Sequence, residues 1–135
     1  MYKEINTIEE AIKRYKEPVD LEKMKSAVAF LPKQIAGGML ALAMLQIAVW
    51  TVNNDDPAVP EWKADFNDED QEKWFPWYRG GNSTGSGFRF YGTYCGWTYT
   101  HSAGGARLAL KDEERAEHMN EFFQELYKQL WLILE

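Results

Sequence analysis

The 135-residue chain is poor in the side chains that most often build covalent or metal chemistry. It has one cysteine and two histidines, so no intramolecular disulfide can form and no zinc site can be built from paired cysteines. It also lacks a basic excess, because 15 lysines and arginines are outnumbered by 21 acids and the net charge is −6. This balance argues against a protein whose main task is to neutralise phosphates. We expect neither a cofactor nor a bound metal.

The first 30 residues predict two short helices. Thr7 and Glu10 form a capping box ahead of apolar residues at helical spacing, and Pro18 ends that run. Asp20 can cap a second helical segment. The N-terminal sequence is charged and amphipathic without an apolar core region and cleavage site, so it is not typical of a secretory signal.

The segment 35–52, IAGGMLALAMLQIAVWTV, is the one long apolar run. As a helix it would be about 27 Å long, which is close to the thickness of a bilayer core. Gln46 near its middle and the glycines at 37 and 38 argue against a membrane span. We therefore expect a core helix that is buried on most sides, with part of its surface available to a dimer interface.

The next segments predict an acidic loop, a sheet and a final helix. Residues 53–73 combine two prolines with clustered acids and read as a connecting loop. Residues 74–100 hold ten aromatic residues and six glycines, and alternation places Phe90 on one face of a strand and Thr93 and Cys95 on the other. A second strand is predicted where Trp97 and Tyr99 continue the aromatic pattern after Gly96, and a third where Ala106, Leu108 and Leu110 alternate with Arg107 and Ala109. Residues 74–78 are the candidate for an additional edge strand.

Asp112 can cap a last helix that carries a broad apolar stripe, and this helix is expected to cover one face of the sheet. The predicted fold is therefore a single α+β domain with a three-stranded antiparallel sheet. Its parts are a helical region at 1–53, an acidic loop at 54–73, the sheet at 74–111 and the C-terminal amphipathic helix at 112–135.

Four segments in this order resemble small uncharacterised proteins encoded by phages, prophages and related mobile elements of Bacteroidota. They are WKADFNDEDQEKWFPWY at 62–78, GSGFRFYGTYC at 85–95, GARLALKD at 105–112 and AEHMNEFFQELYK at 116–128. Ala106 departs from the serine usual in those relatives. The resemblance covers about residues 35–130 and carries no catalytic motif. It implies a phage origin and the cytoplasm of a bacterial host.

The spacing of residues does not match the motifs of several known binding sites. The glycine-rich stretch from Gly80 lacks the lysine of a phosphate-binding loop, and the acids from Asp65 lack the glycine and the last ligand of a calcium loop. A small enzyme with a site built from Cys95 and His101 remains a weaker alternative, because spacing alone does not exclude a spatial pair.

The leading interpretation is a non-catalytic module that binds a partner protein or forms a homo-oligomer. The expected surface is the sheet face away from the helix, where aromatic rings and guanidinium groups gather. Its candidate ligand-binding residues are Trp77, Arg89, Tyr91, Trp97 and Arg107. The alternative is a binder of single-stranded nucleic acid that uses the same face, where rings would stack on bases.

Overall fold

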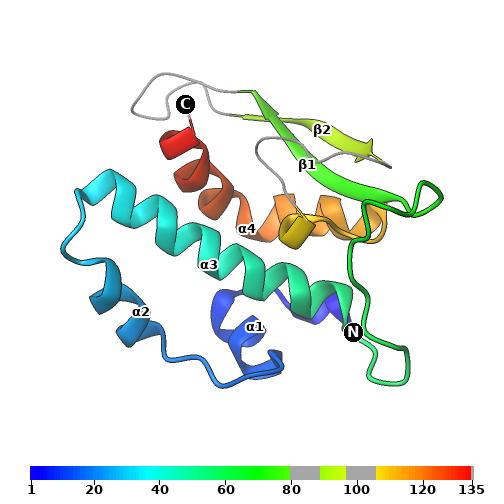
Figure 1. Cartoon of the computed structure of the whole chain (residues 1–135), viewed down its shortest axis with the longest axis horizontal. Helices are drawn as coiled ribbons and strands as arrows, with labels where there is room; N and C mark the ends of the chain where they lie inside the picture. Colours follow the sequence, from blue (N-terminus) through cyan, green and yellow to red (C-terminus); the bar gives the residue numbers. More distant parts are fainter. Residues whose placement is uncertain (80–88, 97–105, 135) are drawn as a thin grey trace.

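The computed structural model describes residues 1–79, 89–96 and 106–134, and it confirms the α+β class (Figure 1). Four α-helices and two antiparallel strands follow one another along these ranges, together with two short 3-10 helices. In chain order the elements are η1 (Tyr2–Glu4), α1 (Ile8–Arg14), α2 (Leu21–Val28), α3 (Lys33–Asn53), β1 (Lys73–Arg79), β2 (Arg89–Gly96), η2 (Ala106–Leu108) and α4 (Glu113–Leu134).

The helix starts follow the predicted capping residues. Thr7 Oγ1 accepts the Glu10 amide at 3.2 Å, and Asp20 Oδ1 accepts the Lys23 amide at 3.1 Å. Asp112 Oδ1 accepts the Arg115 amide at the start of α4 at 2.9 Å. Each cap satisfies one of the amides that the first turn of a helix leaves without an intrahelical acceptor.

Helix α3 is the central helix of the domain. It contacts α1 and α2 on one side and α4 on the other, and its burial begins at Gly38 and continues to Asn53. By length and composition α3 could cross a membrane, with a mean hydropathy of 1.9, but half of its most apolar window is buried inside the protein. This burial supports the core-helix interpretation. The first turns expose Ile35 and Met39, and the predicted dimer interface there stays a prediction.

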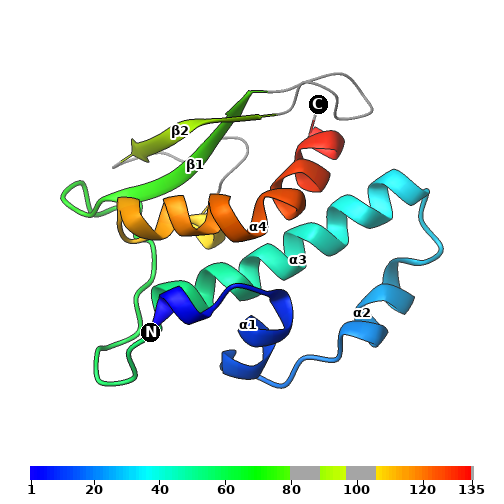
Figure 2. The ribbon, with the colours of Figure 1, turned by 180° about the vertical axis from the view of Figure 1, so that it is seen from behind.

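Helix α4 lies between α3 and the strand pair, as the two opposite views show (Figures 1 and 2). Tyr78 of β1 donates its hydroxyl to Asn120 Oδ1 of α4 at 2.9 Å, and its ring lies 5.3 Å from that of Tyr127. Helix α4 is not straight, because Phe123 leaves helical geometry and its ring is buried in the core at that bend. The predicted covering of the sheet by the last helix is therefore observed.

The strand predicted from Ala106 to Leu110 is not seen, the strand predicted around Trp97 and Tyr99 lies outside the described residues, and the additional edge at 74–78 is β1. Ala106–Leu108 forms a 3-10 turn, and only Leu110 pairs with the sheet, through two 2.8 Å hydrogen bonds to the backbone of Trp74. A strand would place Ala109 on the opposite face from its neighbours. The turn instead allows Leu108, Ala109 and Leu110 to be buried in succession.

A β-bulge corrects the predicted faces of β2. Trp77 pairs with Gly92 and Tyr78 pairs with Phe90, so Tyr91 is an extra residue without a partner in the register. One extra residue exchanges the two faces of the strand beyond it.

Phe90 therefore packs toward the core as predicted, while Thr93 lies on the helix side instead of the predicted outer face. Its hydroxyl donates to Glu113 Oε1 of α4 at 3.2 Å. Cys95 is also reassigned, because it pairs with Trp74, which packs against the core.

A partly buried ion network joins the N-terminus to α3 and α4. Arg115 donates to Asp55 Oδ1 at 2.8 Å and to the Val52 carbonyl at 2.9 Å, and it also contacts Asp112. Asp55 in turn accepts the Tyr2 amide at 2.7 Å. Burial raises the pKa of Asp55, but the hydrogen bonds from Arg115 and Tyr2 and the charge of Arg115 outweigh it, so the pKa is lowered.

Candidate functional site

The structure describes only part of the predicted binding surface. Trp77 is half-buried on β1, and Tyr91 is the bulge residue of β2. Arg89 pairs in register with Arg79 at the end of the strand pair. Trp97 lies outside the described residues. The shared sheet-face site therefore stays a prediction.

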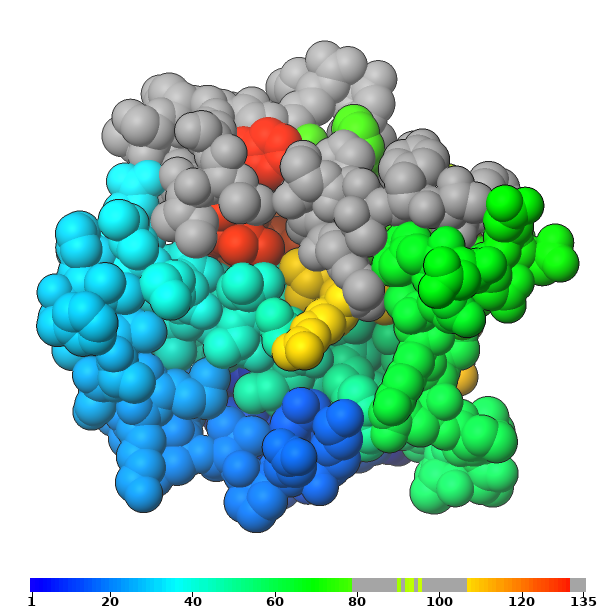
Figure 3. Space-filling model, in the orientation of Figure 1, coloured from blue at the N-terminus to red at the C-terminus, as the bar shows by residue number. Residues whose placement is uncertain are grey.

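Arg107 has a different setting from the one predicted. It lies on η2, is exposed, and lines a cavity of about 450 Å³ beside the C-terminal half of α3. Figure 3 shows η2 in yellow at the surface, on a face that α1, α3 and the 54–72 segment also form. We name this space the Trp50 cavity. Its described lining residues are Tyr15, Lys16, Glu17, Gln46, Val49, Trp50, Asn53, Asn54, Glu61, Trp62, Lys63, Ala64, Arg107 and Ala109.

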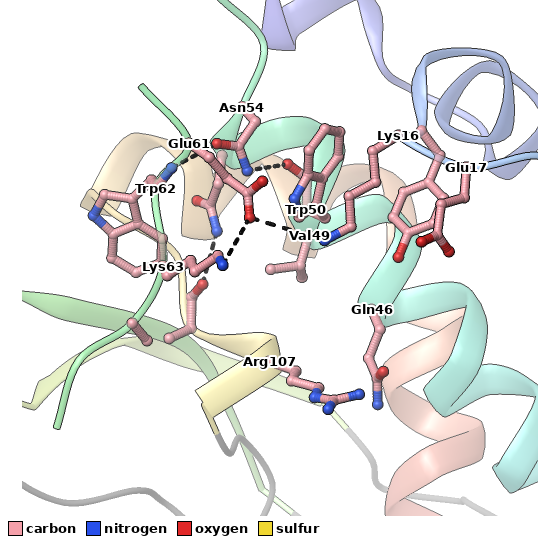
Figure 4. A pocket seen from close by; sticks show the side chains of 14 residues that line it. Lys16, Glu17, Gln46, Val49, Trp50, Asn54, Glu61, Trp62, Lys63 and Arg107 are labelled. Carbon is pink, nitrogen blue, oxygen red and sulfur yellow. Dashed lines mark hydrogen bonds and ion pairs between the residues drawn. The ribbon is translucent and has the colours of Figure 1, made fainter. Parts of the chain in front are cut away.

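Aromatic rings form much of one wall. The edge of the Tyr15 ring meets the Trp50 ring at a centroid distance of 5.4 Å, and Lys16 Nζ lies 5.4 Å from the centroid of Trp50. Trp62, from the acidic loop, supplies a second indole to the cavity (Figure 4). Two indoles in one cavity offer large, rigid contact surfaces that also carry a hydrogen-bond donor each.

Two consecutive asparagines fix the walls in place. Asn53 donates to the Ala109 carbonyl at 2.9 Å and accepts the Lys111 amide at 3.0 Å, which holds the segment after η2 against α3. Asn54 accepts the Trp62 amide at 2.7 Å and donates to the Trp50 carbonyl at 2.9 Å (Figure 4). The cavity therefore has walls tied by hydrogen bonds to the last turn of one core helix.

Charges of both signs lie at the opening. The Glu61 carboxylate is 3.8 Å from Lys16 Nζ and 3.5 Å from Lys63 Nζ, and Figure 4 shows it between them. Both contacts are longer than a hydrogen bond of good geometry, and the three side chains are exposed to solvent. Pairs of this kind stabilise a protein little, but they leave the Glu61 carboxylate facing both ammonium groups.

Three polar groups on the walls have no protein partner within the described ranges. The Trp50 Nε1 atom is buried and has no acceptor there. The Gln46 amide and the Arg107 guanidinium make no hydrogen bond or ion pair in the same part of the chain, and they extend toward one another in Figure 4. Gln46 is half-buried and Arg107 is exposed, so these two groups can meet a polar ligand, whereas the Trp50 nitrogen has almost no accessible surface.

The cavity lacks the side chains of a serine- or cysteine-type catalytic site among its described lining residues. Its described lining residues contain no Ser, Thr, Cys or His. Cys95 lies elsewhere, on β2, and burial, together with Glu72 and Glu113, raises the pKa of its thiol. A thiol with a raised pKa is protonated at neutral pH and is a poor nucleophile. His101, the other half of the predicted pair, lies outside the described residues.

No group of three or more His, Cys, Asp or Glu in residues 1–79, 89–96 and 106–134 is arranged to hold a metal ion. The acidic loop has an internal cation instead. Lys73 is fully buried, and its ammonium donates to the carbonyls of Asp68 and Gln71 at 2.8 and 3.0 Å. Gln71 closes the loop by accepting the Asp65 amide and donating to the Lys63 carbonyl.

Sequence reasoning missed most of the cavity. Trp50 reads as one more apolar residue of a core helix, and Lys16 and Glu61 read as solvated charges. The available signal was the pair of asparagines that ends an otherwise apolar helix, followed within a polar loop by an isolated tryptophan. No family model, curated protein or solved structure matches the chain.

Proposed function

We propose that this protein is a non-catalytic module that binds another protein through the Trp50 cavity. The observation that carries the proposal is a preformed cavity whose lining includes two indoles, Trp50 and Trp62, and the exposed Arg107. A volume of about 450 Å³ lies within the range of sites that hold a small ligand or a few residues of a peptide. Indoles are also the side chains most enriched where interfaces derive their binding energy.

The biological setting is proposed from the sequence resemblance. The protein would be an accessory protein of a phage or prophage, acting in the cytoplasm of a bacterial host. The partner would be a host or phage protein, or a second copy of the chain. Self-association is measured by sedimentation of the purified chain, and a complex that persists in the Trp62→Ala variant would place that contact outside the cavity.

The direct test uses a library of random peptides and the full-length chain. Enriched peptides are synthesised, and their affinities are measured by titration calorimetry against wild type, Trp50→Phe and Trp62→Ala. Trp50→Phe removes the N–H but keeps a ring, while Trp62→Ala removes a wall. We expect losses of about tenfold or more for Trp62→Ala, which is the size typical of a central interface residue.

Phe30→Ala is the matched control, because Phe30 is 82% exposed and does not line the cavity. It should leave the affinities unchanged. If the enriched peptides bind both cavity variants as well as wild type, the Trp50 cavity is not the binding site and the proposal is wrong.

A nucleic-acid ligand is the second candidate, because Lys16, Lys63 and Arg107 stand beside two indoles in the same cavity. Rings interleaved with cations are typical of sites for single strands. A thymidine oligonucleotide is the probe, and its affinity should fall steeply with salt if phosphates are neutralised.

A further inference from the structure

We infer that the segment of the partner that enters the Trp50 cavity presents one carboxylate, and that Arg107 holds it. This inference rests on the proposed function and specifies the chemistry of its ligand. It follows from how the three cationic side chains of the cavity lining are paired. Arg107 has no anionic partner among the described residues, whereas Lys16 and Lys63 already face the Glu61 carboxylate.

Arg107 is the cationic side chain that is available to a ligand. It is exposed at the cavity wall, and the described part of the chain gives it neither an ion pair nor a hydrogen bond. A guanidinium is a planar fork of donors that matches the two oxygens of a carboxylate. Because η2 is followed by the Ala109 and Lys111 backbone contacts to Asn53, the base of the Arg107 side chain is held on a fixed segment.

The neighbouring groups favour a peptide around that carboxylate. The half-buried Gln46 amide offers both a donor and an acceptor in the cavity lining. A peptide backbone supplies carbonyl and amide groups of both kinds, while its side chains can lie against the indoles. The cavity therefore offers one strong site for an anion and several neutral polar contacts.

A polyanion fits the same cavity poorly. Lys16 and Lys63 already face the carboxylate of Glu61, which lies between them. Glu17 adds a second carboxylate to the lining, and the whole chain carries a net charge of −6. A chain of phosphates would have to displace Glu61 and approach the negative charge of Glu17. A single carboxylate at Arg107 needs to do neither.

The experiment compares four forms of the random peptide library on the full-length chain. The C-terminus is either a free acid or an amide, and Asp and Glu are either included or replaced by Asn and Gln. The first pair reports a terminal carboxylate and the second a side-chain carboxylate. We expect the form without any carboxylate to yield no ligand that depends on Trp62.

Variants at Arg107 connect that preference to one side chain. Arg107→Gln should weaken the enriched peptides at least tenfold and abolish the preference for the acid, and Arg107→Lys should lie between it and wild type. Lys25→Gln is the matched control, because it removes one exposed positive charge on α2 away from the cavity. Thermal melts of the variants check that the exposed Arg107 is not needed for folding.

The outcomes separate the two levels of the proposal. If peptides bind in a Trp62-dependent manner but equally well without a carboxylate or in Arg107→Gln, this inference is wrong and the proposed function stands. If no peptide depends on Trp62, both are wrong. Binding of the thymidine oligonucleotide to wild type, with steep salt dependence and loss in Arg107→Gln, would also overturn the carboxylate assignment.

Glu61→Gln gives an independent readout. It removes the internal carboxylate that faces Lys16 and Lys63, so two further cations become open to a ligand. We expect this variant, unlike wild type, to bind the oligonucleotide with an affinity that falls steeply with salt. Equal oligonucleotide binding by wild type and variant would show that Glu61 does not select against polyanions, and would overturn that part of the inference.

Discussion

Replacing Asn53 by alanine should lower the free energy of unfolding by about 2–4 kcal/mol, because it leaves two backbone groups without partners. The Asn53 side chain is 3% exposed, and its amide donates to the Ala109 carbonyl and accepts the Lys111 amide. Each buried group left unpaired costs about 1–3 kcal/mol, so two groups cost about 2–6 kcal/mol, and because Lys111 is only half-buried we expect the lower part of that range. The loss of packing adds little, because the side chain is small.

Urea unfolding followed by tryptophan fluorescence measures this effect. With a slope of about 2 kcal/mol per molar urea, the midpoint should fall by about 1–2 M. Asn67→Ala is the matched control, since Asn67 is exposed on the acidic loop, and it should change stability by less than about 0.5 kcal/mol. A loss below about 1 kcal/mol for Asn53→Ala at unchanged slope would refute the reasoning, because it would mean that Ala109 and Lys111 find other partners.

Two further predictions concern the acid stability and the glycines. The pKa of Asp55 is lowered in the folded protein. The ionised carboxylate therefore contributes to the free energy of unfolding above the ordinary pKa of 3.8, and this contribution is lost as the pH falls through the lower folded pKa. Asp55→Asn should therefore be less stable at pH 7, and urea titrations should show its deficit shrinking below about pH 4; a deficit that is constant with pH would contradict this. Gly92→Ala should lower the melting temperature, because φ is +143° there although an added Cβ would meet nothing within 4 Å. Gly37→Ala should raise the melting temperature, because glycine inside a helix costs about 1 kcal/mol relative to alanine and an added Cβ would meet nothing within 4 Å there either. If the two glycine variants shifted the melting temperature in the same direction, this reasoning would be wrong.

The parts of the fold that the sequence predicted are those set by neighbours in the chain. Thr7, Asp20 and Asp112 cap the helices they were expected to cap, because a cap joins residues two or three positions apart. The apolar run at 35–52 became α3, since its composition is compatible with little other than burial. Such features depend on local geometry and on hydrophobicity, both of which are read directly from the residues.

The sheet was predicted less well from local sequence patterns. Alternation predicted the faces of β2 correctly at Phe90 and wrongly at Thr93 and Cys95, because the bulge at Tyr91 shifts the register by one residue. Gly92 marks the position, but a glycine within a strand is equally consistent with a turn. The expected strand around Leu108 is a 3-10 turn in the structure, because alternation over a few residues does not distinguish a strand from a short turn.

The candidate site was beyond prediction because its walls are brought together by tertiary hydrogen bonds. Side chains of consecutive helical residues point about 100° apart, so Asn53 and Asn54 reach different segments from one turn of α3. Asn53 holds the backbone beyond η2, and Asn54 holds the backbone at Trp62. Trp50 lies one turn earlier on the same helix, and its carbonyl is bonded to Asn54, so its indole is set between the two attached segments. The end of the core helix thus both closes the hydrophobic core and forms part of the cavity wall, so a change that loosens either asparagine should disturb the cavity together with the fold.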